Sequence, residues 1–218
     1  SFALDAGTDA DSNVAIGYQA LTAHTQNNNV AIGHSAMKDS TTGGENTAIG
    51  NAVMRDGSGF IHCTAVGANA LQDNNGNNNT AVGYNAGTAN TSGINNVYVG
   101  KFSGRSGTSG SRNICVGNET MEASNTGSDN VAFGHNGLTS NSSGYKNVAV
   151  GSSALDNNTT GYGNIVAGFH AGGNITTGYA NTCIGHECGD TLTTGHSNIC
   201  IGYQADTNTA ARADSITI

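Results

Sequence analysis

A glycine recurs every 16 or 17 residues through this chain of 218 residues, and this period constrains the fold more than any other feature. The glycine closes a short phrase, as at residues 13–17, 29–33 and 147–151, that reads Asn, Val or Thr, Ala, Ile or Val, Gly. Self-similarity at a fixed step indicates a repeat architecture in which neighbouring units share a core. The repeat glycines are Gly17, Gly33, Gly50, Gly67, Gly83, Gly100, Gly117, Gly134, Gly151, Gly168, Gly185 and Gly202.

The length of the repeat favours a β-solenoid. A unit of 17 residues is shorter than helical repeats of about 33 residues or more. One solenoid coil fits, because a five-residue strand can pair in parallel with the strand one coil earlier, at about 4.8 Å. Proline is absent, as a sheet paired on both sides requires. We therefore predict an all-β solenoid (β-roll) of about 13 coils of 16–17 residues. We expect residues 1–218 to form one continuous array, uncapped at both ends as a fragment of a longer fibre.

An asparagine precedes the repeat glycine by four residues in almost every unit. Stacked asparagines hydrogen-bond amide to amide along cross-β assemblies and tolerate turn conformations. The sequence therefore predicts an asparagine ladder along the rod, with one gap where Cys63 replaces asparagine. The ladder residues are Asn13, Asn29, Asn46, Asn79, Asn96, Asn113, Asn130, Asn147, Asn164, Asn181 and Asn198.

Alternation along each strand predicts two faces of different character. Small alanines suit the narrow interior of a coil of 17 residues. The β-branched residues then form an outer stripe, which a rod in water should bury. Three rods burying this stripe on a common axis would form a parallel homotrimer; the reverse assignment, with the stripe inside, would permit a monomer. Representative stripe residues are Val14, Ile16, Val30, Ile32, Val148 and Val150.

The phrase at 13–21 resembles repeats of two related kinds of fibrous protein. The core of the phrase is similar to the head repeats of trimeric autotransporter adhesins of the YadA type. The longer form, through Tyr18-Gln19-Ala20-Leu21, is more similar to arrays in phage tail-fibre and related virion proteins. The resemblance implies a parallel homotrimer on a virion or bacterial surface that serves as an adhesive or receptor-binding stalk. Two departures are the length of the repeat and the five cysteines.

The five cysteines, at 63, 115, 183, 188 and 200, suggest small core residues rather than a disulfide framework. Most stand where other repeats have alanine, and cysteine packs as a slightly larger alanine. Free buried thiols favour assembly in a reducing compartment, which favours the virion fibre over the secreted adhesin. The run His186-Glu187-Cys188 fits no zinc spacing, and the run 73–79 lacks the glycine and distal glutamate of a calcium loop. We therefore expect no metal, no cofactor and a solvated turn at 73–79.

No catalytic constellation emerges, so we expect a non-enzymatic protein. The net charge of −8 with seven basic residues argues against nucleic acid. No apolar stretch approaches the ~20 residues of a membrane span, which argues against insertion. A cell-surface glycan or protein receptor remains as a partner besides further copies of the chain. Aromatic residues follow several repeat glycines (Tyr18, Tyr84, Phe169 and Tyr203), and other groups break the repeat. The candidate ligand-facing residues are Arg55, Phe60, His62, Lys101, Phe102 and Arg105.

Overall fold

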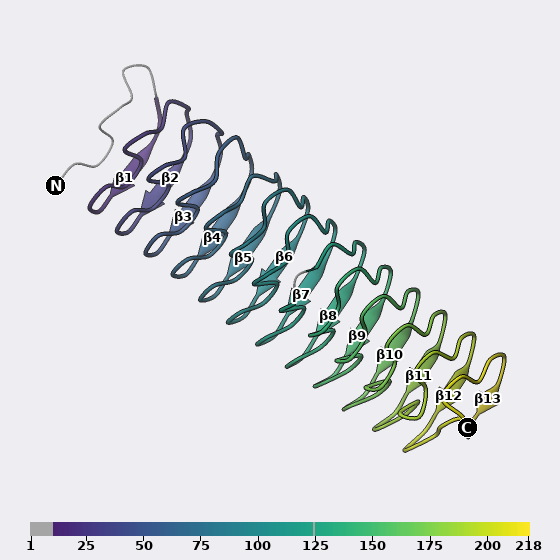
Figure 1. The fold of residues 1–218 in the computed structure, drawn as a ribbon. Helices are drawn as coiled ribbons and strands as arrows, with labels where there is room; N and C mark the ends of the chain where they lie inside the picture. The colour runs from purple at the N-terminus through teal and green to yellow at the C-terminus, as the bar shows by residue number, and fades with distance from the viewer. Residues whose placement is uncertain (1–10, 124) are drawn as a thin grey trace.

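The computed structural model describes residues 11–123 and 125–218, and this part of the chain is a rod of stacked coils without a helix (Figure 1). One parallel sheet runs along the rod, with its strands hydrogen-bonded in the order of the sequence. The β-solenoid that the glycine period predicts is thus confirmed. The strands are β1 (Val14–Ile16), β2 (Val30–Ile32), β3 (Thr47–Ile49), β4 (Thr64–Val66), β5 (Thr80–Val82), β6 (Val97–Val99), β7 (Ile114–Val116), β8 (Val131–Phe133), β9 (Val148–Val150), β10 (Ile165–Ala167), β11 (Thr182–Ile184), β12 (Ile199–Ile201) and β13 (Ile216–Thr217).

Each strand pairs in register with the same positions of the next coil, as Val131 pairs with Val148 and Phe133 with Val150. The strands span three residues, or two in β13, rather than the five expected from the phrase. The shorter span has a local cause at the C-terminal end, where the repeat glycine adopts a positive φ that ends the extended chain. Backbone pairing nevertheless continues one residue further, since the Gly151 N–H donates to the Phe133 carbonyl at 2.8 Å.

The chain completes a coil in so few residues because it adopts a left-handed conformation at several places in each repeat. In the coil of Gly134 these are Asn136 and Leu138, with φ of 58° and 53°, and Lys146, with φ of 56°. Such a conformation costs an L-residue roughly 1–2 kcal/mol. The hydrogen bonds between successive coils offset this cost: the N–H groups of Asn136 and Leu138 donate to carbonyls of the preceding and following coils.

The interior contains more than the expected column of alanines. The central residue of each strand from β2 to β12 is buried, and so is the alanine three residues after the glycine, as at Ala20, Ala36 and Ala70. Next to these, Leu or Met occupies the fourth place after the glycine in seven coils and is also buried. These larger residues fill most of the core volume: Leu21, Met37, Met54, Leu71, Met121, Leu138 and Leu155.

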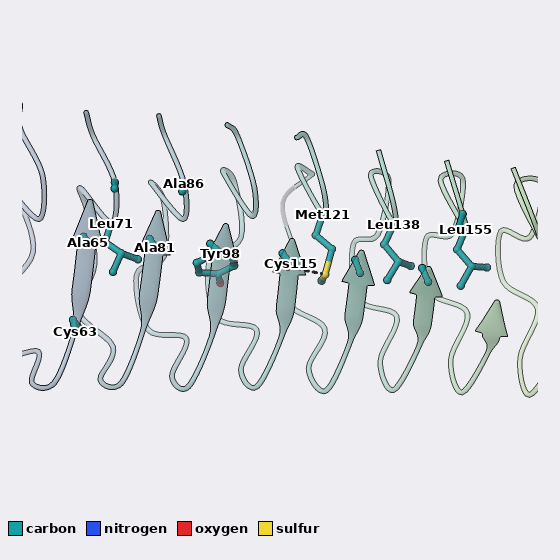
Figure 2. Packing of buried hydrophobic residues seen from close by; sticks show 14 of the residues in the cluster. Cys63, Ala65, Leu71, Ala81, Ala86, Tyr98, Cys115, Met121, Leu138 and Leu155 are labelled. Carbon is teal, nitrogen blue, oxygen red and sulfur yellow. Dashed lines mark hydrogen bonds between the residues drawn. The ribbon is translucent and has the colours of Figure 1, made fainter. Parts of the chain in front are cut away.

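Where one coil has a larger core side chain, the neighbouring coils have smaller ones beside it. Tyr98 replaces the central alanine of β6, and its ring lies in the core between coils whose leucine place is glycine (Figure 2). A Cβ on Gly87 would lie 2.6 Å from Tyr98 Cδ2, and one on Gly104 would lie closer still. The same arrangement recurs at Gly189, whose missing side chain gives room to Cys183 and Leu192. A constant core volume, rather than a constant residue, is therefore what each coil preserves.

Candidate functional site

The expected asparagine ladder lies inside the rod. Asn147 is fully buried, its Nδ2 donates to Asn130 Oδ1 at 3.2 Å and to the Gly161 carbonyl at 2.8 Å, and its Oδ1 accepts the Asn164 backbone N–H at 3.0 Å. The same bonds recur through Asn181 and Asn198. Each amide therefore closes the turn of its own coil and joins it to the coil before and after.

Cys63 interrupts this ladder. Its backbone N–H still donates to Asn46 Oδ1 at 2.9 Å, but its thiol lacks the amide oxygen that would accept the Asn79 N–H. The thiol instead lies 3.3 Å from the Gly76 carbonyl, and Asn74 Nδ2 approaches the sulfur at 3.6 Å. Asn74 also accepts from Asn79 Nδ2 at 3.1 Å, so a neighbouring amide takes over part of the bonding.

The structure contains a second column of buried asparagines that the sequence analysis does not predict. It comprises Asn74, Asn90, Asn125, Asn141 and Asn158, and its amides bond along the rod, as Asn158 Nδ2 does to Asn141 Oδ1 at 2.8 Å. The sequence signal for this column is an asparagine seven residues after the glycine in four of these coils, and eight residues after it at Asn125.

His24 occupies the same place in its own coil and is also buried. Its Nε2 accepts from Asn29 Nδ2 at 2.8 Å and its Nδ1 donates to the Ser40 carbonyl at 2.9 Å, which assigns a neutral imidazole protonated on Nδ1. The expectation of a solvated turn at 73–79 is wrong for Asn74 and Asn79, because both amides point into the core.

All five cysteines are free and buried. Burial raises the pKa of the Cys63 and Cys115 thiols and raises that of Cys200 to about 11. A hydrogen bond with Cys188 and burial together raise the pKa of Cys183. Cys188 Sγ donates to the Cys200 carbonyl at 2.9 Å. The hydrogen bond with Cys183 lowers the pKa of Cys188. The other four thiols stay protonated, pack as small apolar residues and are poor nucleophiles.

The run 186–188 does not converge on one point. The exposed His186 ring stacks on Phe169 at 5.2 Å and on Tyr203 at 5.4 Å between ring centres, whereas Cys188 is buried. In the described ranges no three His, Cys, Asp or Glu side chains form a group that could hold a metal ion.

The six candidate ligand-facing residues separate into three groups. Phe60 is wrong as a ligand-facing residue: it is fully buried and belongs to the hydrophobic core. Its coil carries Gly57 at the inward place that Ser40 and Asn74 hold in neighbouring coils. Arg55 and His62 remain at the surface, where Arg55 forms an ion pair with Asp56 at 2.7 Å and His62 Nε2 lies 3.1 Å from a Glu45 carboxylate oxygen.

Lys101, Phe102 and Arg105 come together on one coil. Lys101 Nζ lies 4.6 Å and the Arg105 guanidinium 4.7 Å from the centre of the Phe102 ring, as cation–π contacts require. Arg105 also pairs with Glu122 at 2.7 Å in the next coil. The two cations are thus engaged by groups of the chain itself.

Aromatic residues form stacks along the rod. Tyr145, Tyr162, Tyr179 and His196 lie six residues before successive repeat glycines, with centres 4.9, 4.9 and 4.6 Å apart and planes within 10° of parallel. Between neighbours in this stack the ring faces are covered, so the edges meet solvent. All four aromatic residues expected after the glycine, Tyr18, Tyr84, Phe169 and Tyr203, are exposed. Their faces are likewise partly covered by the ring of a neighbouring coil: His34 beside Tyr18, Phe102 beside Tyr84, and His186 between Phe169 and Tyr203.

The outer face of the sheet carries the expected apolar stripe. The first and third residues of the strands point away from the core. Of the predicted stripe residues, Val14, Ile16 and Val150 are 44%, 57% and 43% exposed, whereas Val30, Ile32 and Val148 are half-buried. Every residue in these two rows is Val, Ile, Thr, Phe or Ala, and none is charged. The alanines therefore face inward and the β-branched residues outward, the arrangement that leaves the sheet uncovered in a single chain.

No protein-family model, no curated protein and no solved structure matches this chain. Within the described residues, no helix is long and apolar enough to cross a membrane.

Proposed function

We propose that the chain is a non-enzymatic fibre segment in which three parallel copies bury the outer sheet face on a common axis. The segment serves as the shaft of a phage or virion tail fibre and presents a host-receptor-binding surface on its remaining flanks. The head of a bacterial trimeric adhesin is the alternative with the same architecture.

The observation that carries the proposal is the absence of charge from two exposed rows along the whole described sheet. An exposed flat sheet normally carries charged residues that oppose association, and a long apolar stripe marks an interaction surface. Covering the exposed part of two such side chains contributes roughly 1–2 kcal/mol per coil. Summed over the stack, this exceeds the association cost of about 4–15 kcal/mol.

The buried thiols support the virion assignment over the adhesin. Free cysteines persist in a reducing cytoplasm, where a phage fibre assembles, and are prone to oxidation during secretion.

Light scattering over a range of concentrations tests the proposal. A trimer gives a mass three times the chain mass of 21.8 kDa, independent of concentration. A mass that grows with concentration would favour the alternative of subunits stacked end to end in an extracellular filament. A mass of one chain would contradict both assemblies.

A further inference from the structure

A polar groove follows one flank of the rod, away from the apolar stripe. Its larger part, about 720 Å³, is lined by Ser140, Asn157, Thr159, Asn174, Thr176, Asp190, Thr191 and Thr193. A second hollow of about 440 Å³ shares Ser140 and continues towards Glu122 and Arg105. Together they cross the coils from Gly100 to Gly185, a length of roughly 24 Å at the usual strand spacing.

In the larger part of the groove most lining residues are the sixth and eighth after the repeat glycine, while the seventh points inward. Asp190 there, and Arg105 and Glu122 in the second hollow, are fifth residues. In the coil of Gly151 these outward residues are Asn157 and Thr159, and the buried residue between them is Asn158. The next coil repeats the pattern with Asn174 and Thr176. The Asn and Thr pair thus occupies two successive coils, and the coil of Gly185 continues the groove with Thr191 and Thr193.

Most hydrogen-bond donors of the groove wall already donate to other groups of the chain. The hydroxyl of Thr159 donates to the Thr176 carbonyl at 3.0 Å, and that of Thr176 to the Thr193 carbonyl at 3.2 Å. Asn157 Nδ2 donates to the Gly173 carbonyl at 2.8 Å, and Asn174 Nδ2 donates to Asp190. What these side chains offer to a ligand is therefore the lone pairs of their oxygens.

The two carboxylates of the groove each have a basic side chain beside them. Asp190 lies 3.3 Å from His170, and Arg105 bonds Glu122. A wall of oxygen acceptors with no free cation disfavours carboxylated or sulfated polymers, and the net charge of −8 adds to that repulsion. Peptide strands are also disfavoured, because the backbone N–H groups along this flank already bond the next coil, as Thr159 N and Thr176 N do.

From these contacts we infer that the groove binds an extended, neutral polysaccharide, whose hydroxyl groups donate to the Thr and Asn oxygens of successive coils. This inference rests on the proposed attachment function and names the class of receptor. The rise of one coil is close to the length of one pyranose unit, so consecutive sugars meet equivalent oxygens.

A glycan array carrying neutral glucan, mannan, galactan and chitin oligosaccharides beside oligouronate, sialylated and sulfated glycans tests the inference. We expect binding to neutral chains, strengthening with chain length until the groove is filled. The double variant Thr159→Val and Thr176→Val removes two acceptors while keeping side-chain shape, and should weaken binding about tenfold.

Thr25 and Thr91 provide a matched control outside the groove. They hold the same place in their coils and donate to the next coil at 3.0 and 3.1 Å, so Thr25→Val with Thr91→Val has the same structural cost and should bind as the parent does. Absence of binding to every neutral glycan, a preference for acidic ones, or equal loss in both double variants would overturn the inference. A trimeric mass in that case would leave the fibre proposal intact, so the two failures are distinguishable.

Discussion

Replacing Gly134 by alanine should destabilise the rod severely. Gly134 has a φ of 129°, outside the range that L-residues readily adopt, and strain of this kind costs about 1–3 kcal/mol. A Cβ there would also lie 2.5 Å from the Gly151 carbonyl oxygen and 2.6 Å from its carbon. Relieving that overlap separates two coils and lengthens bonds such as Gly151 N–H to the Phe133 carbonyl, at about 1 kcal/mol each. We expect a total loss of about 3–5 kcal/mol.

Gly137 in the same coil is the matched control. A Cβ at Gly137 would meet the Ala132 Cβ at 3.7 Å and backbone oxygens at 3.9 Å, which is ordinary contact. Other coils carry alanine at this place, so Gly137→Ala should be neutral or more stable by about 0.4–1 kcal/mol. Urea unfolding followed by circular dichroism, at one protein concentration, compares the two variants with the parent. A Gly134→Ala variant within 1 kcal/mol of Gly137→Ala would refute the close-packed coil junction.

Variants at Asn147, Tyr98 and Asp156 test the side-chain packing further. Asn147→Ala removes two donated bonds and the acceptor of the Asn164 N–H, and should lower the free energy of unfolding by about 3 kcal/mol in urea titrations. Tyr98→Ala should lower the free energy of unfolding by about 3–5 kcal/mol. Gly87→Leu alone should also destabilise the chain, but Gly87→Leu added to Tyr98→Ala should restore part of the lost stability. Simply additive effects of the two substitutions would show that the side chains do not share one space. Burial raises the pKa of Asp156, so the folded chain binds this proton more tightly and the penalty at neutral pH is relieved as the pH falls through that pKa. Asp156→Asn should therefore raise the Tm at neutral pH. The Tm of this variant should also lack the increase that protonation of Asp156 gives the parent as the pH falls, which melting curves at several pH values will show.

The repeat pattern sufficed to predict the coil, the parallel register and the inward alanines, because these depend only on the period and on strand alternation. The compensation of a large core side chain in one coil by glycines in its neighbours was not predictable in this way. Tyr98 and Phe60 appear in the sequence as departures from the repeat, and both rings lie in the core. For Tyr98 the reason becomes visible only in space, where Gly87 and Gly104 leave room for the ring.

The groove was missed for a related reason. Its Thr and Asn residues look like ordinary turn decoration in the sequence. Their outward alternation about the buried Asn158 becomes visible only when the coils are stacked.

The mass of a charged stripe variant tests the central claim most directly. Val150 is 43% exposed on the outer sheet face, so lysine there leaves a single chain folded but places three cations on a shared axis. By light scattering, Val150→Lys should have the single-chain mass of 21.8 kDa, whereas Thr160→Lys, in a turn away from the strands, should keep three times that mass. A Val150→Lys protein of trimeric mass would contradict assembly through the apolar stripe.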